Sequence, residues 1–224
     1  MAGPTALPQI EAFALGPFGT NCYLVHTGHG GEGWIVDASY GPEELIDRAR
    51  ALALRITGII ITHAHGDHIA GLDDIRAAFP NAPVYAHQAE ADWFGNPDLN
   101  LSAAFGAPVR VKGPDRLLHG GETLHLGAWE WKVMHTPGHS PGMIALHCAA
   151  CHAVIVGDTL FAGSIGRYDY PTSDEAALFR SIREGLMALP DDTRVLAGHG
   201  PATTIGRERK FNPFLRGPAA GAGG

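Results

Sequence analysis

Cysteine is scarce in this sequence, and so are charged residues. Three cysteines in 224 residues are an odd and small number, which argues against a disulfide framework and fits a reducing compartment. Charged residues make up 17 % of the chain and the formal net charge is −7. The chain therefore lacks the basic excess that nucleic acid and anionic membranes require, and we expect neither as a partner.

Long apolar runs and an export signal are also missing. No apolar run approaches the roughly 20 residues that a membrane helix needs. The first eight residues hold neither a basic nor an apolar segment, so we expect no signal peptide and a cytoplasmic protein. Hydrophobic residues nevertheless make up 45 % of the chain, enough for a substantial core. We predict one domain over residues 1–217 and a disordered, Ala- and Gly-rich tail at 218–224.

Apolar periodicity predicts an α/β protein. Predicted strands cover residues 9–15, 21–26, 34–37, 58–61, 84–86, 122–126, 129–135, 143–147, 153–156 and 194–198, the last being the final strand. Predicted helices start at Pro42, at Ile69, at Gln88 (a short one to Phe94) and after a Ser173 cap, the last running to about Ala188. Residues 95–114 are predicted to form a long loop. This order fits two packed β-sheets with helices outside.

The densest cluster of chemistry-bearing residues lies at 63–68, between the apolar run at 58–61 and the helical pattern from Ile69. His63 and His65 are two residues apart, so in an extended backbone they point the same way. Asp67 and His68 follow at the predicted start of the helix. Imidazole and carboxylate are ligands for Zn, Fe or Ni. Four potential ligands in one loop suggest that two metal ions share the segment.

Three later segments place a ligand-type residue at the end of a predicted strand. His139 lies in a rigid bend of Pro and Gly residues at 136–142. Asp158 ends the apolar strand that begins at Ala153, and His199 stands between two glycines after the strand at 194–198. Singly, each is weak, because a strand-end His or Asp often only caps a turn. Together with residues 63–68 they form a coherent set.

The ordered set His-x-His-x-Asp-His, His139, Asp158 and His199 resembles the metallo-β-lactamase-fold hydrolases. The resemblance extends from the second predicted strand to Leu215 and implies a four-layer αββα sandwich with mixed sheets. It implies that His63, His65 and His139 hold one divalent metal ion, that Asp67, His68 and His199 hold a second, and that Asp158 bridges both. A bridging anion relieves the repulsion between two dications about 3.5–4 Å apart. Zn²⁺ is the expected ion, with Fe or Mn as alternatives.

The same resemblance implies roles for other residues. Asp67 and Asp158 are expected to be catalytic by orienting a water whose pKa the metals lower to about 7. Asp37 matches the superfamily's early aspartate, which supports a ligand rather than binding metal. A plain turn residue before Gly41 is the alternative for Asp37.

The segment from Gly157 to Arg167, with Asp-Thr-Leu-Phe followed by Gly-Ser-Ile-Gly-Arg, is similar to the glyoxalase II-related group, particularly its short bacterial members. That group implies hydrolysis of a small thioester, S-lactoylglutathione or a relative. Long glyoxalase II enzymes add a C-terminal helical domain with basic glutathione contacts, which we expect to be absent here. The expected substrate contacts are Arg167, Tyr168, Tyr170, Arg207 and Lys210. A packed surface loop is the alternative for the first three.

Two other functions stay open. A mononuclear iron persulfide dioxygenase on the same fold would use the histidine pair, His139 and Asp158. Cys148 and Cys151 begin a literal C-x-x-C-H string, which in exported proteins attaches haem, so a haem-binding electron carrier is a further alternative. Since the string lies between two apolar strands, we interpret it as a hairpin turn. The sequence leaves the oligomeric state undetermined.

Overall fold

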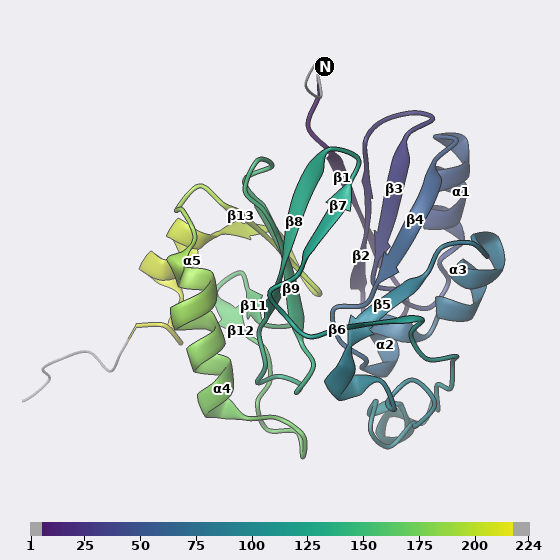
Figure 1. Ribbon diagram of the computed structural model, residues 1–224. Coiled ribbons are helices and arrows are strands. Elements are labelled where there is room, and N and C mark those ends of the chain that lie inside the picture. Colours follow the sequence, from purple (N-terminus) through teal and green to yellow (C-terminus); the bar gives the residue numbers. More distant parts are fainter. Residues whose placement is uncertain (1–5, 217–224) are drawn as a thin grey trace, which may run out of the picture.

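The computed structural model describes residues 6–216 of the chain. Two six-stranded sheets face each other (Figure 1). The first sheet has the order β1-β2-β3-β4-β5-β6, antiparallel as far as β3 and parallel from there. Its strands are β1 (Gln9–Leu15), β2 (Thr20–His26), β3 (Glu32–Val36), β4 (Arg55–Ile60), β5 (Val84–His87) and β6 (Arg116–Leu118).

The second sheet has the order β14-β13-β10-β9-β8-β7 and is antiparallel except for the pair β10 and β13. Its strands are β7 (Thr123–Leu126), β8 (Trp129–His135), β9 (Ile144–Cys148), β10 (Ala153–Gly157), β13 (Arg194–Ala197) and β14 (Thr203–Thr204). A small hairpin of β11 (Leu160–Phe161) and β12 (Ser164–Ile165) follows β10.

Helices cover the outer faces of both sheets (Figure 1). The first sheet carries α1 (Glu43–Ala51) and α3 (Leu72–Ala78), with the single turn α2 (Gly66–Ile69) at its end. The second carries α4 (Glu175–Arg180) and α5 (Ile205–Phe211). Single turns of other helix types lie at Gln88–Glu90, Ser102–Phe105, Ser181–Gly185 and Leu186–Ala188. The predicted four-layer αββα sandwich with mixed sheets is confirmed.

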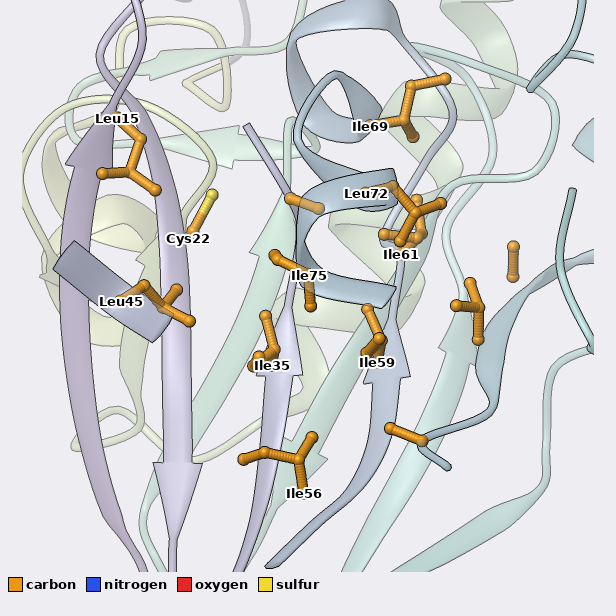
Figure 2. Close-up of a cluster of buried hydrophobic side chains, with 14 of the residues drawn as sticks. Leu15, Cys22, Ile35, Leu45, Ile56, Ile59, Ile61, Ile69, Leu72 and Ile75 are labelled. Carbon is orange, nitrogen blue, oxygen red and sulfur yellow. The ribbon is translucent and has the colours of Figure 1, made fainter. Parts of the chain in front are cut away.

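Each layer boundary has its own apolar core. β4 serves two of them: Ile59 faces the helices, whereas Ile60 faces the other sheet, and both are fully buried. Figure 2 shows Ile59 and Ile61 among the side chains between the first sheet and its helices. Between the sheets, Trp34 meets Trp131 edge to face, with ring centroids 6.0 Å apart. A strand buried on both faces reads as a continuous apolar run, which explains the sequence before residue 62.

The helix predicted from a Ser173 cap to about Ala188 does end at Ala188, but its cap is another residue and its second half is irregular. The side chain of Asp174 accepts a hydrogen bond from the Ala177 N–H and caps α4 instead. Ser173 Oγ donates to the His139 carbonyl, so it is not free to cap. After Arg180 the helix widens into a π-turn and then tightens into a 3₁₀-turn ending at Ala188.

Two other predictions of local structure were wrong. The helix predicted from Gln88 to Phe94 is one 3₁₀-turn at Gln88–Glu90, closed by a hydrogen bond from the Ala91 N–H three residues back to the Gln88 carbonyl. The strand at 194–198 is not the last, since β14 and α5 follow it. Thr204 caps α5 by accepting from the Arg207 N–H.

Three further expectations concern the ends and the surroundings of the fold. The long loop at 95–114 is confirmed, with one 3₁₀-turn in it. The tail predicted at 218–224 lies outside the described residues, and the extent of the domain stays a prediction. No helix within residues 6–216 is long and apolar enough to cross a membrane.

Candidate metal centre

The residues at 63–68 lie directly beyond the carboxyl end of β4. His63 and His65 occupy the connection, and α2 then carries Asp67 and His68. Gly66 between them packs against the loop at 95–114: its N–H donates to the Asn100 carbonyl, and a Cβ there would lie 2.7 Å from that of Ser102. A glycine is required here because of this close approach, which a larger residue would prevent.

The other three candidate ligands lie beyond strands of the second sheet. His139 follows β8, Asp158 follows β10 and His199 follows β13. The two sheets are joined at this point, because Asn21 in β2 donates two hydrogen bonds across the gap: its N–H donates to the Gly198 carbonyl and its side-chain amide to the Ala197 carbonyl. The structure therefore brings residues of both halves to one place.

The seven side chains form overlapping triads whose ligand atoms lie within 4.8 Å of one another. The triads are His63 with His65 and His139, His63 with His68 and Asp158, and Asp67 with His68 and His199. In the first, His139 Nε2 lies 3.0 Å from His65 Nδ1. In the last, His199 Nε2 lies 3.2 Å from Asp67 Oδ2.

Asp158 lies between the two outer triads. Its Oδ2 is 3.8 Å from His139 Nε2 and 3.4 Å from His199 Nε2, and its Oδ1 is 3.5 Å from His68 Nε2. One carboxylate thus faces ligand atoms of both groups. This is the position that a carboxylate shared by two cations requires.

Several buried polar atoms of this cluster have no hydrogen-bond partner within residues 6–216. Those on the ring or carboxylate edge that faces the other ligands are Nε2 of His63, Nε2 of His68 and Oδ1 of Asp158. Buried polar atoms are normally satisfied, so a group of unsatisfied ones needs an explanation. Metal ions supply it: nitrogen and carboxylate donors that face one another are the donor set of divalent transition metals. The residues present fit such ions.

Protonation differs between the two sides of the cluster. Burial, and then the neighbouring imidazoles, hold the pKa values of His63 and His65 well below the ordinary value, so both are neutral and ready to donate a lone pair. Burial also opposes a charge on His68 and His199. For His68, attraction to Asp67, Asp158 and Asp37 and the hydrogen bond with Asp37 outweigh burial and raise the pKa to about 9. For His199, hydrogen bonds with Asp158 and Asp67 and attraction to both raise the pKa to about 10.

Comparisons with known proteins show the family of this chain. The model of a family described as the metallo-beta-lactamase superfamily matches residues 15–199. The chain belongs to this superfamily. It is 37 % identical over 204 residues to a Bacillus subtilis protein named "Probable metallo-hydrolase YqgX", covering 91 % of this chain and 95 % of that one. It is 33 % identical over 209 residues to a Haemophilus influenzae protein named hydroxyacylglutathione hydrolase GloC, covering 92 % and 98 %.

Solved structures agree with this membership. The crystal structure of BLEG-1, a B3 metallo-beta-lactamase, superposes with a TM-score of 0.89 at 39 % identity and covers 93 % of this chain and all of that one. The structure of TTHA1623 in a di-iron-bound form gives 0.81 at 38 % identity, covering 92 % and 100 %. A metallo-beta-lactamase fold with a His and Asp cluster indicates divalent metal ions at this place.

In this superfamily member, hydrogen bonds donated by Nδ1 fix three imidazoles of the cluster. His68 Nδ1 lies 2.9 Å from Asp37 Oδ2, His139 Nδ1 lies 2.8 Å from the Arg167 carbonyl, and His199 Nδ1 lies 3.2 Å from the Phe18 carbonyl. Each bond leaves Nε2 directed at the centre. The partner of His68 is the residue that the family resemblance indicated as a support.

Asp37 does more than hold one ring. Its carboxylate accepts from the Thr62 N–H at 2.7 Å and the Thr62 hydroxyl at 2.8 Å, so it also fixes the backbone just before His63. Asp37 has a φ of 62°, and aspartate is among the few residues that tolerate this region. The alternative of a plain turn residue does not account for these buried contacts.

Glu90 is a supporting residue that the sequence did not reveal. Its carboxylate is buried and accepts from the Ala64 N–H and the Gly142 N–H, both at 2.6 Å. It therefore connects the loop of His63 and His65 to the loop of His139. Burial raises its pKa. No motif marks it, because its role depends on two loops that only the fold brings together.

A cavity of about 130 Å³ opens onto the cluster. Its lining includes five of the candidate ligands, and its other large side chains are Phe18, Tyr40, Leu101, Phe105 and Tyr170. Of the expected substrate contacts, Tyr170 alone is part of this lining among the described residues. The ring of Tyr168 packs against Phe179 in the core below α4.

The basic residues among those expected contacts lie elsewhere. Arg167 pairs with Asp169 at 2.8 Å, and its guanidinium lies 4.4 Å over the ring of Tyr170. Arg207 and Lys210 lie on α5, where both are exposed. The structure therefore does not bring these three to the cavity wall.

The C-x-x-C-H string forms the turn between β9 and β10, as interpreted from the sequence. Cys148 and Cys151 lie with their Sγ atoms 2.7 Å apart. Cys148 is fully buried in the core between the sheets. Attaching a porphyrin to it would require opening that core, which argues against a haem carrier.

Proposed function

We propose that this protein is a dinuclear metal-dependent hydrolase of thioesters, with S-lactoylglutathione or a related 2-hydroxyacyl thioester as substrate. The observation that carries the proposal is the place of Asp158 between the two outer triads, since a carboxylate shared by two groups of ligands suits a pair of cations. The relationship to a protein named hydroxyacylglutathione hydrolase supports the substrate class.

The residues divide into two sets that share Asp158. His63, His65 and His139 would hold one ion, and Asp67, His68 and His199 the other. Two divalent cations held there would supply Lewis acidity and lower the pKa of a water molecule toward about 7. Zn²⁺ is the proposed ion and Fe or Mn the alternatives, since all three accept this donor set.

The chain itself orients the reactants. Asp67 and Asp158 line the cavity, so their carboxylates can accept a hydrogen bond from the attacking water. Thr20 Oγ1 donates to Asp67 Oδ2 at 2.8 Å and holds that carboxylate in place. In the reaction, the water oxygen bonds to the thioester carbonyl carbon, the carbon–sulfur bond breaks, and the thiol leaves with a proton from the water.

Metal analysis combined with a thioester assay tests this proposal. We expect two ions per chain and hydrolysis of S-lactoylglutathione. His199→Ala should lose one ion and Asp158→Ala most of both, each with loss of activity. His125→Ala is the matched control, because that imidazole is exposed on β7 and outside the cluster. A fully loaded protein that cleaves no thioester would refute the substrate class.

The persulfide dioxygenase alternative is separated in the same experiment. It would need only one ion and would consume oxygen with glutathione persulfide. The triad of Asp67, His68 and His199 has no role in a mononuclear site, so its presence favours the hydrolase. Oxygen consumption at one ion per chain would reverse this preference.

A further inference from the structure

The cavity over the metal centre has a wall that the hydrolytic chemistry does not use. Among the side chains of residues 6–216 that line it, none is a lysine or an arginine. The guanidinium of Arg167 is occupied by Asp169. A peptide thiol such as glutathione carries two carboxylates, and no lysine or arginine in the lining is available to pair with them.

Two phenylalanines from distant segments meet at this wall. Phe18 lies in the turn between β1 and β2, and Phe105 ends the 3₁₀-turn at 102–105. Their ring centroids are 5.5 Å apart, with the planes at 71°. Nevertheless 48 % of Phe18 and 56 % of Phe105 remain exposed. Large aromatic side chains left open beside a cavity mark a place where apolar surface can still be buried.

Both rings stand on backbone that is tied to the metal centre. The Phe18 carbonyl lies 3.2 Å from His199 Nδ1. On the other side, the Asn100 carbonyl accepts from the Gly66 N–H, next to His65 and Asp67. The side chain of Asn100 fixes the rest of the loop, because Oδ1 accepts from Ser102 Oγ at 2.6 Å and Nδ2 donates to the Val109 carbonyl at 3.1 Å. The backbone that carries the aromatic pair is therefore connected to the ligands on both sides.

The backbone next to Phe105 supports the same conclusion. Leu101 lines the cavity and has a φ of 64°, which a leucine rarely adopts. Strained backbone persists where the surroundings determine it, and it concentrates at functional sites. Here the surroundings are the hydrogen bonds of Asn100, and the result is an apolar side chain facing the cavity.

We infer that Phe18 and Phe105 select the substrate by packing on an uncharged apolar group of the thioester, and that the carboxylates of a peptide thiol contribute little to binding. This inference rests on the proposed function, and it names the class of substrate. The apolar group can belong to the acyl part or to the thiol part of the thioester. The chemistry of recognition is the same in both cases, so the test must contain both.

Four thioesters separate the possibilities. S-acetyl-N-acetylcysteamine is the small uncharged reference. S-benzyl thioacetate replaces the thiol of the reference by phenylmethanethiol and so places a phenyl ring on the thiol side. S-phenylacetyl-N-acetylcysteamine adds a phenyl ring on the acyl side, and S-acetylglutathione replaces the thiol by one that carries two carboxylates. Burying much of one ring predicts a kcat/KM about tenfold above the reference for at least one phenyl substrate, through KM. S-acetylglutathione should remain close to the reference.

Truncation of the two rings tests which residues are responsible. Phe18→Ala and Phe105→Ala should each raise KM for the preferred phenyl substrate about fivefold, with kcat and the reference substrate little changed. Phe→Leu at either position should recover much of this loss. Phe211→Ala is the matched control, because Phe211 is exposed to a similar 58 % but lies on α5, outside the cavity lining.

A binding measurement makes the result independent of turnover. S-(2-phenylethyl)-N-acetylcysteamine is a thioether that cannot be hydrolysed, and its Kd from calorimetry should rise about fivefold in each Phe→Ala variant. A wild-type preference for S-acetylglutathione, or a KM and Kd that do not respond to the truncations, would overturn the inference while the hydrolase stands. Weakened thioether binding without hydrolysis of any thioester would support the inference and refute the proposed function.

Discussion

Replacing Asp37 by asparagine should weaken the binding of the metal ion held by His68 without disturbing the fold around this site. Asparagine has nearly the same shape and also tolerates a φ of 62°. The carboxylate accepts three hydrogen bonds, from the N–H and hydroxyl of Thr62 and from His68 Nδ1. An amide offers one acceptor oxygen and one donor nitrogen, so in either orientation a donor of Asp37→Asn faces another donor.

The magnitude follows from what is lost. A buried donor without an acceptor costs about 1–3 kcal/mol. Loss of a group that supports a ligating histidine typically weakens metal binding about 10- to 100-fold, or about 1.4–2.7 kcal/mol, and the two ranges agree. We expect the decrease mainly for one of the two ions, because the triad of His63, His65 and His139 does not include His68.

Chelator competition with Zn²⁺ measures the two affinities separately. The matched control is Asp47→Asn, since that carboxylate is on the surface of α1 with 77 % of its side chain exposed. If Asp37→Asn bound both ions as tightly as the control, the account of how His68 is positioned would be wrong. Equal weakening of both sites would instead show that the effect passes mainly through Thr62.

Three further predictions concern the same region. Gly198→Ala should abolish binding of the two metal ions, because a Cβ would overlap Asp158 Oδ1 and lie 2.8 Å from His68 Cε1. Metal analysis checks this. Gly95→Ala, where nothing lies within 4 Å of the added Cβ, should leave the metal content unchanged. Glu90→Gln should lower the free energy of unfolding by about 1–3 kcal/mol, because its amide must face the N–H of Ala64 or Gly142, and a denaturant titration with an unchanged midpoint would contradict this. Metal uptake at neutral pH should release protons, because His68 and His199 have pKa values raised to about 9 and about 10 and a cation binds only the neutral rings. The apparent metal affinity should therefore rise with pH toward these values. Calorimetry in buffers of different ionisation enthalpy should detect the released protons.

The sequence allowed the layers of the fold to be predicted because its long elements are strongly periodic. The run before residue 62 is apolar on both faces, and β4 is indeed buried on both. Short elements could not be predicted: β14 has only two residues, and its pairing with β13 is visible only in the fold. The change of helix type after Arg180 was not predicted, because Leu178, Ile182 and Leu186 recur every four residues, as in a regular helix.

The candidate ligands could be identified because they belong to a dense motif and to strand ends in a fixed order. Of the residues that support the ligands, only some could be identified from the sequence. Asp37 stands at the end of a strand, so the family pattern revealed it. No motif identifies Glu90 or Thr20, because the role of a single carboxylate or hydroxyl depends on which segments it contacts in the folded chain. The same holds for Phe18 and Phe105, which are 87 positions apart by their numbers (105 − 18) and touch only in the folded chain.

The candidate ligands come from both halves of the sandwich, and this affects how stable the protein is against proteolysis. His63 to His68 follow the first sheet, whereas His139, Asp158 and His199 follow the second. Bound ions would therefore cross-link the halves and stabilise the native chain in proportion to their free concentration. Starvation for metal would leave more of the molecules transiently open to proteases, so metal supply would govern abundance as well as activity.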